Sequence, residues 1–391
     1  MSDSSPGSGE AQGMCASGGH TVRVSYRDGL ITSVETSEAG PDSGGAPVLA
    51  PGFIDAQVNG YDGFDVNAPG LSPDVIIGLT RRLARIGVTT WTPTLVTAGE
   101  EALIERLAVI AAARRRDDRT ARAIPDVHIE GPFISQHDGA RGVHDPALVR
   151  PIDPDEVRRW QHTGAPIGIV TVSPHDEAAP AAIARIVALG VRVAIGHTHA
   201  TPEQITAAVD AGATLSTHLG NGIEAVLPRH PNAIWTQLAD DRLTAGFIGD
   251  GHHLPLETVE VLLRSKSVGR AFLVSDTTDI AGKAPGRHAS SVGGTVELAA
   301  DGRLSYPGTG YLAGSGVDLA TAFRTVLQRT TLTLDEALKL VTSTPAGILP
   351  HARPGLGTLV VGAPADLVTL DPLTGAVLAV VQSGTPVEPP R

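Results

Sequence analysis

Two histidines follow two successive apolar runs in the middle of the chain. Residues 191–196 (VRVAIG) precede His197 and residues 213–217 (ATLST) precede His218, with a helical pattern between the runs. If both runs are neighbouring strands of a parallel sheet or barrel, the residues at their carboxyl ends point into one site. Imidazole is the commonest metal ligand among side chains, so this pair is the first candidate for a metal centre.

Two acidic residues occupy equivalent places after other strand-like runs. Glu130 ends residues 125–130, and Asp276 follows residues 270–275. Glu130, His197 and His218 make a three-ligand set, which leaves a divalent metal an open position for water or substrate. Such a metal lowers the pKa of water towards neutrality, and Asp276 is placed to take the proton and pass it to a leaving group. The pattern therefore indicates metal-assisted hydrolysis.

Each of these residues also has a purely structural interpretation. The two histidines can be hydrogen-bonded residues at loop starts, Glu130 a buried structural carboxylate, and Asp276 a helix N-cap. His128 lies within the same strand-like run, and we expect it to pack rather than to bind a ligand. Three more histidines carry no spacing argument and are expected at the surface or behind the site: His137, His175 and His199.

The segment after His218 has features of an anion site. In Leu219-Gly220-Asn221-Gly222 the glycine backbone can present amide N–H groups to an anion. Arg229 lies further along the same loop and could clamp a phosphate through two hydrogen bonds. A solvated loop charge is the alternative interpretation of Arg229.

The order of strands and helices predicts the scaffold that positions these side chains. Helical patterns separate eight strand-like runs, at residues 48–58, 88–96, 125–130, 166–172, 191–196, 213–217, 243–249 and 270–275. Eight such alternations predict an α/β fold, a (β/α)8 TIM-like barrel, whose active site lies at the carboxyl ends of the strands. An open doubly wound sheet is the alternative fold.

The two ends of the chain are predicted to meet in a second, smaller domain. Residues 1–20 are rich in Ser and Gly and are expected to form a disordered tail. Alternating patterns place a small β-sandwich domain at residues 21–47 and 356–391, around the barrel at residues 48–355.

Composition narrows the classes of function. The chain has 391 residues and a formal net charge of −12, which argues against a general surface for nucleic acid or acidic membranes. Cys15 is the only cysteine, so any metal site must use His and carboxylate ligands. We see no secretory signal and no run long enough to span a membrane, and therefore expect a cytoplasmic protein.

An ordered set of short motifs resembles one enzyme family. The set is Pro51-Gly52-Phe53-Ile54-Asp55 with Gln57 and Asn59, His128-Ile129-Glu130-Gly131-Pro132-Phe133, Gly196-His197, Thr217-His218-Leu219-Gly220-Asn221, Asp250-Gly251-His252-His253, Val274-Ser275-Asp276 and Leu312-Ala313-Gly314-Ser315. Together these motifs, over about residues 48–371, are similar to the N-acetylglucosamine-6-phosphate deacetylases of the amidohydrolase superfamily.

The resemblance implies a homodimeric enzyme that removes the acetyl group from its amino-sugar phosphate. It implies that Glu130, His197 and His218 bind one divalent metal ion, with zinc expected first and iron or another divalent ion as alternatives. It implies that Asp276 is the general base and acid and that His144 helps to polarise the acetyl carbonyl. The substrate-binding residues that the resemblance implies are Val143, Asn221, Gly222, Arg229, His253, Leu312, Ala313 and Gly314.

One departure from the wider superfamily bears on the number of metals. Many amidohydrolases carry His-x-His on the first strand, whereas this chain has Gln57-Val58-Asn59. A neutral amide is a poor ligand beside imidazole, so we predict one tightly bound metal rather than two. The alternatives are hydrolysis of another N-acetylated amino sugar, unphosphorylated ones included, or of a cyclic amide, and a non-catalytic sugar-phosphate-binding barrel.

Overall fold

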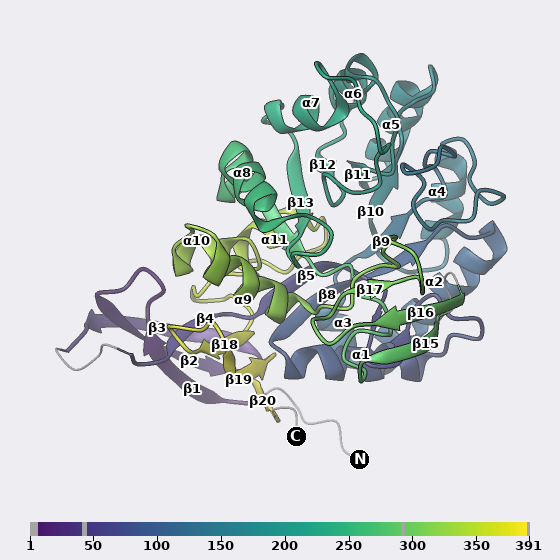
Figure 1. The fold of residues 1–391 in the computed structure, drawn as a ribbon. Helices are drawn as coiled ribbons and strands as arrows, with labels where there is room; N and C mark the ends of the chain where they lie inside the picture. The colour runs from purple at the N-terminus through teal and green to yellow at the C-terminus, as the bar shows by residue number, and fades with distance from the viewer. Residues whose placement is uncertain (1–6, 41–44, 291–293, 389–391) are drawn as a thin grey trace.

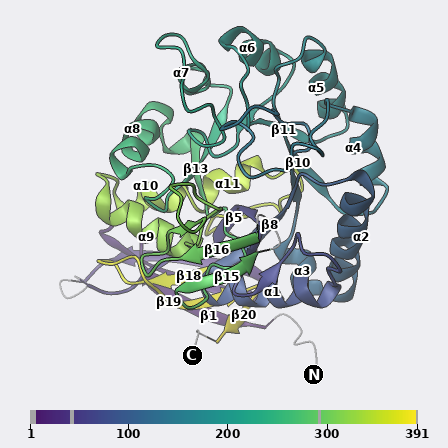
Figure 2. The same cartoon turned by 45° about the vertical axis from the view of Figure 1, so that its right-hand side comes forward.

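The computed structural model describes residues 7–40, 45–290 and 294–388. Eight parallel strands form one sheet in which each strand pairs with the next along the chain, in the order β14-β13-β12-β11-β10-β9-β8-β5. A parallel bridge between Val58 and Thr277 joins the first strand to the segment after the last. The sheet is therefore nearly closed into the predicted barrel (Figures 1 and 2). The strands are β5 (Phe53–Val58), β8 (Val88–Val96), β9 (Val127–Glu130), β10 (Ile167–Val172), β11 (Arg192–Ile195), β12 (Leu215–Ser216), β13 (Thr244–Ile248) and β14 (Ala271–Val274).

The barrel strands are buried on both faces, as parallel strands covered by helices must be. In β8 (VTTWTPTLV) eight of the nine residues are buried. A separate core cluster joins apolar residues of six barrel strands to α11 and to Leu349 and Leu356 beyond it. The helices are α1 (Pro73–Arg85), α2 (Glu100–Arg116), α3 (Asp118–Ala123), α4 (Pro154–Gln161), α5 (Ala179–Ala188), α6 (Pro202–Asp210), α7 (Ala233–Ala239), α8 (Leu256–Lys266), η1 (Val268–Arg270), α9 (Leu319–Arg329), α10 (Leu334–Lys339) and α11 (Ser343–Ile348).

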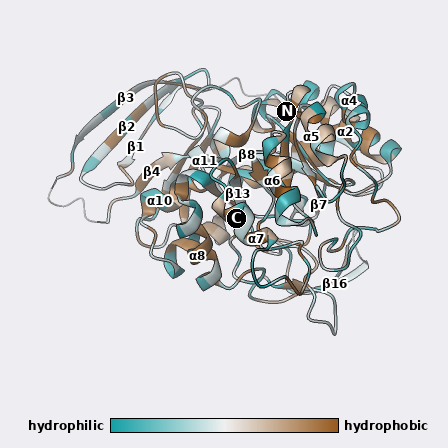
Figure 3. Ribbon diagram, turned by 90° about the horizontal axis from the view of Figure 1, so that it is seen from above, coloured by the Kyte–Doolittle hydropathy of each residue, from teal (hydrophilic) through white to brown (hydrophobic). Residues whose placement is uncertain are grey.

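Several of the outer helices are amphipathic, and several start at a side-chain cap. Helix α6 begins with a full capping box, in which Thr201 and Gln204 satisfy each other's backbone N–H groups. Hydrophobic and hydrophilic stretches alternate along the helices that surround the sheet (Figure 3). No helix among the described residues has the length and apolar character that a membrane span requires.

A second sheet of seven strands combines both ends of the chain, in the order β20-β19-β18-β4-β1-β2-β3. In Figure 1 the purple strands of the N-terminal end lie beside the yellow strands of the C-terminal end. All seven strands belong to one hydrogen-bonded sheet. They are β1 (Gly9–Met14), β2 (His20–Arg27), β3 (Leu30–Glu38), β4 (Val48–Pro51), β18 (Leu367–Leu370), β19 (Val377–Gln382) and β20 (Thr385–Val387).

The expectation of a disordered tail at residues 1–20 was wrong for strand β1. This strand pairs along its whole length with β2, and Met14 also pairs with Val48 of β4. Its composition is poor in β-forming residues, but backbone pairing on both sides holds it in the sheet. Residues 1–6 lie outside the described part of the chain.

The single strand expected at residues 48–58 is divided between the two sheets. Gly52 separates β4 from β5, and its N–H donates to Asp366 O. A Cβ atom at Gly52 would lie 2.2 Å from Thr89 Oγ1, so only glycine fits where the chain crosses from one sheet to the other. Two small sheets complete the fold: β6 (Gly60–Tyr61) with β7 (Phe64–Asp65), and β15 (Gly286–Ser290), β16 (Gly294–Leu298) and β17 (Leu304–Ser305).

Candidate metal centre and active site

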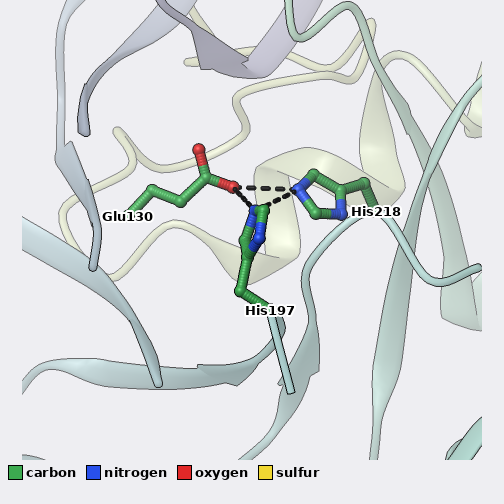
Figure 4. Close-up of side chains that lie close together, drawn as sticks. All are labelled: Glu130, His197 and His218. Carbon is green, nitrogen blue, oxygen red and sulfur yellow. Dashed lines mark hydrogen bonds and ion pairs between the residues drawn. The ribbon is translucent and has the colours of Figure 1, made fainter. Parts of the chain in front are cut away.

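Glu130, His197 and His218 converge at the carboxyl ends of three barrel strands (Figure 4). Glu130 Oε1 lies 3.2 Å from His197 Nε2 and 2.9 Å from His218 Nε2. All three residues are buried. No other such group of three His, Cys, Asp or Glu side chains is found in the described ranges.

The donor atoms of this cluster fit a divalent cation. His197 Nδ1 lies 2.9 Å from the carbonyl oxygen of Ala140, which can only accept, so Nδ1 carries a proton. In a ring that carries this proton alone, the lone pair of Nε2 faces Glu130. A carboxylate oxygen and an imidazole lone pair repel each other unless a proton or a cation lies between them. A carboxylate and two imidazoles are a typical divalent-metal set.

The charges within the cluster favour its ionised carboxylate. Burial alone raises the pKa of Glu130, but its contacts with the imidazoles of His197 and His218 outweigh burial and lower the pKa well below its usual value. Burial lowers the pKa of His218, but the hydrogen bond with Glu130 outweighs burial, so the pKa of His218 is raised overall. A carboxylate that stays charged among buried imidazoles is the state that metal binding requires.

Three residues of the site adopt a backbone conformation that residues other than glycine seldom take. The φ angle is 48° at His197, 26° at His218 and 51° at Asp276. Each of them lies two residues after the end of a strand. Left-handed backbone at non-glycine residues costs energy and concentrates at functional sites, where it directs side chains to a common point.

Asp276 shares the cavity with this cluster and is held by the side-chain amides of Gln57, in β5, and of Asn59, directly after β5. Its Oδ1 accepts hydrogen bonds from Gln57 Nε2 at 3.1 Å and from Asn59 Nδ2 at 2.8 Å. Gln57 Nε2 also donates to Glu130 Oε1 at 2.9 Å. Burial, reinforced by the negative charge of Glu130, raises the pKa of Asp276 to about 6. A carboxyl group of this pKa can both accept and return a proton near neutral pH.

His144 is a neutral imidazole at the edge of the metal cluster. Its ring centroid lies 4.5 Å from that of His197, with the two rings nearly perpendicular. Burial lowers the pKa of His144 to about 3, and the neighbouring imidazole of His197 acts in the same direction. Its Nδ1 lies 2.8 Å from Thr97 Oγ1, which leaves Nε2 for a ligand.

One cavity of about 380 Å³ contains this cluster and most of the residues predicted to bind substrate. His253 lines it, and His253 Nδ1 lies 2.7 Å from Oδ2 of the buried carboxylate Asp250. The residues predicted from the sequence that line the cavity are Glu130, Val143, His144, His197, His218, Asn221, Gly222, His253, Asp276, Leu312, Ala313 and Gly314.

The structure does not bring Arg229 into this cavity. Arg229 is exposed, between the exposed residues Pro228 and His230 on the loop that follows Asn221. Its predicted contact with the substrate therefore stays a prediction, because Arg229 does not line the cavity of the single chain. His128 packs as expected, with Nε2 at 2.7 Å from Thr171 Oγ1 inside the barrel.

The sequence did not identify several polar residues of the cavity wall. Asp65, Asn67 and Asp279 line the cavity together with the exposed ring of Tyr311. Asp65 ends β7, and the others lie in loops outside the named strands and helices. Only the tertiary path of these loops brings them to the site, so neither spacing nor periodicity could have found them.

The match of the chain to known proteins agrees with this geometry. The model of the amidohydrolase family matches residues 48–388, most of the chain. This chain belongs to the amidohydrolase family. It is therefore a hydrolase of a metal-dependent family, and the cluster of Glu130, His197 and His218 is its candidate metal site.

Named relatives of this amidohydrolase are deacetylases. The chain is 32% identical to N-acetylgalactosamine-6-phosphate deacetylase of Escherichia coli O157:H7, over 90% of each chain. It is 35% identical to N-acetylglucosamine-6-phosphate deacetylase of Bos taurus, over 84% of this chain and 81% of that one. A solved mutant of the Mycobacterium smegmatis N-acetyl-D-glucosamine-6-phosphate deacetylase, in complex with N-acetyl-D-glucosamine-6-phosphate, superimposes with a TM-score of 0.83 at 30% identity, over 94% of each chain.

Proposed function

We propose that this amidohydrolase removes the acetyl group of N-acetylglucosamine 6-phosphate, giving glucosamine 6-phosphate and acetate. The observation that carries the proposal is that Asp276 and the cluster of Glu130, His197 and His218 line one cavity, where Gln57 donates to both Asp276 and Glu130. The named relatives support the substrate, because one of them is solved with this sugar phosphate bound.

In this mechanism Glu130, His197 and His218 would hold one divalent ion, for which zinc is our first candidate and iron a second. The ion would act as a Lewis acid towards the acetyl carbonyl and water. Asp276 takes the proton that water loses as it attacks the carbonyl carbon. Asp276 then returns this proton to the amine nitrogen as the C–N bond breaks, so that the products are acetate and the free amino sugar.

We assign His144 the task of donating a hydrogen bond to the carbonyl oxygen. A neutral imidazole suits this task, because its N–H stabilises the negative charge that develops on oxygen without repelling a nearby cation. Burial keeps the pKa of His144 at about 3, so the ring is neutral throughout the working range.

The sugar and its phosphate occupy the rest of the cavity in this proposal. Leu312, Ala313 and Gly314 line one wall, and Val143 lies beside His144. We place the phosphate near His253, Asn221 and Gly222, because an imidazole and backbone N–H groups are suited to bind an anion. Arg229 remains a proposed phosphate ligand only if its loop moves or a second chain lies against the site.

The deciding experiment compares four sugars on zinc-loaded protein, with free amine as the readout. The sugars are N-acetylglucosamine and N-acetylgalactosamine, each with and without the 6-phosphate. We expect the highest kcat/KM with N-acetylglucosamine 6-phosphate. A preference for the phosphorylated galactose isomer would favour the second candidate, which the relative from Escherichia coli supports by its name. Equal rates with and without phosphate would overturn the phosphate assignment.

Arg229→Ala tests the phosphate end of the cavity separately. If Arg229 reaches the phosphate, its loss lowers kcat/KM for the phosphorylated sugar alone. An equal loss with the unphosphorylated analogue would contradict this role.

We further propose that the protein is a homodimer, as the family resemblance implies, and that it is cytoplasmic. Light scattering during size-exclusion chromatography tests the dimer, and fractionation of cells that express it tests the compartment.

A further inference from the structure

Among the described residues, the hydroxyl of Thr97 is the one hydrogen-bond partner of Nδ1, the inner ring nitrogen of His144. Thr97 follows β8, which ends at Val96, and is 8% exposed. Its Oγ1 lies 2.8 Å from His144 Nδ1. The two residues come from separate loops, 47 positions apart in the chain. The contact is thus a tertiary one that joins the end of β8 to the loop after β9.

The proton of a neutral imidazole can sit on either ring nitrogen, and the proposed role of His144 requires it on Nε2. Nδ1 must then accept a hydrogen bond, which calls for a donor beside it. A threonine hydroxyl can donate. Within the described residues, Thr97 Oγ1 has no other hydrogen-bond partner, so no second acceptor competes for its proton. A positively charged His144 would be unfavourable, because its ring packs against His197 beside the cation site.

Gly131 keeps the space that this hydroxyl occupies. A Cβ atom at Gly131 would lie 2.1 Å from Thr97 Oγ1, closer than any real contact. Its φ is +87°, which side-chain-bearing residues rarely adopt. The residue directly after the metal-cluster carboxylate Glu130 therefore leaves room for the Thr97 hydroxyl to reach the ring.

We propose that Thr97 is a positioning residue, whose hydroxyl donates to His144 Nδ1 and so keeps the proton on Nε2, directed into the cavity. This inference rests on the proposed deacetylation for its kinetic consequence, but not for the tautomer itself. A purely structural role is the competing explanation, in which Thr97 only fills space or accepts a proton from Nδ1.

The experiment uses the zinc-loaded protein and two variants of similar size. Thr97→Val replaces the hydroxyl by a methyl group, and Thr97→Ser keeps a hydroxyl. 15N NMR of protein labelled in histidine reports which ring nitrogen carries the proton, and His144→Gln assigns the signals of His144. Circular dichroism and zinc content show whether each variant is folded and loaded.

We expect the wild type and Thr97→Ser to carry the proton on Nε2, and Thr97→Val to move it wholly or partly to Nδ1. We expect kcat of Thr97→Val for N-acetylglucosamine 6-phosphate to fall about 10- to 100-fold with little change in KM, and Thr97→Ser to stay within about threefold of the wild type. A wild-type proton on Nδ1, or unchanged His144 signals in folded Thr97→Val, would overturn the proposal. If no sugar is deacetylated, the proposed function fails, while the NMR result still decides the role of Thr97.

Discussion

The Nε2 atoms of His197 and His218 lie 3.1 Å apart, and both face the same carboxylate oxygen of Glu130. Two buried imidazole nitrogens this close cannot both be protonated at these positions without repulsion. The two Nε2 atoms and the Glu130 oxygen can each direct a lone pair to the same point. A divalent cation is the simplest group that would bind all three.

The first prediction concerns the two imidazoles of this cluster. Either His197→Ala or His218→Ala should lose stoichiometric metal, and kcat should fall by roughly 10³-fold or more, because groups that act as a unit fail together. Metal analysis after gel filtration and an amine-release assay check both effects. His175→Ala is the matched control, since His175 does not line the catalytic cavity. Retention of a full equivalent of metal in both variants would contradict the assignment.

Asp276→Asn should separate chemistry from metal binding. The amide keeps an oxygen that Gln57 and Asn59 can donate to, but it cannot carry the proton, so we expect kcat to fall by about 10²- to 10⁴-fold. Metal content should stay at the wild-type value. For the wild type, kcat/KM should decline as the pH falls below about 6, where Asp276 becomes protonated and cannot act as a base. A bound cation favours the ionised carboxylate and shifts this decline of kcat/KM to lower pH. A decline centred well above pH 6 would therefore exclude Asp276 as its cause.

The raised pKa of Asp276 also predicts a stability effect in metal-free protein. Its pKa in the folded state is about 6 against a usual 3.8, so ionisation is less favourable in the folded state and stability is lost as pH rises through this interval. Metal-free Asp276→Asn should therefore melt at a higher temperature than metal-free wild type at pH 7, and the difference should vanish near pH 3. Calorimetry at the two pH values measures it, and an equal or lower Tm at pH 7 would refute the argument.

The contacts of Gln57 bear on the number of metals. Gln57 Nε2 donates to both Glu130 and Asp276, so this end of the amide offers protons where a second cation would need lone pairs. We predict one equivalent of zinc in the wild type. Replacing Gln57 and Asn59 together by histidine should raise the zinc content towards two equivalents per chain, as measured by elemental analysis. Two equivalents in the wild type would show that this amide does not exclude a second ion.

The sequence was sufficient to predict that Glu130, His197 and His218 come together, because the ends of strands can be recognised from local patterns. Glu130, His197 and His218 each stand at the end of an apolar strand, and the parallel order of the strands brings those ends together. Amphipathic helices between the strands indicated the barrel in the same way. The predicted small β domain also has its counterpart in the seven-stranded sheet, although β4 belongs to that sheet and not to the barrel.

The remaining features depend on the path of the loops, which local patterns do not encode. Thr97 and Asn67 are ordinary loop residues by sequence. Only the folded chain brings Asn67 to the cavity and Thr97 to the ring of His144. Arg229 is placed by a loop whose direction periodicity cannot predict. Strand β1 was missed because Gly9–Met14 carries little β propensity and finds its partners in β2 and, at Met14, in β4.

Strand β1 links the two halves of the seven-stranded sheet. It lies between β4 and β2, so the β2–β3 hairpin reaches the other strands of that sheet through it. A chain trimmed to begin at residue 21 would lose this bridge and the first residue of β2. The truncation would expose two sheet edges with unpaired N–H and C=O groups, which can pair with other chains and promote self-association. The composition of residues 1–20 suggests that they can be removed without harm. Their removal would nevertheless lower solubility before it lowers catalytic activity.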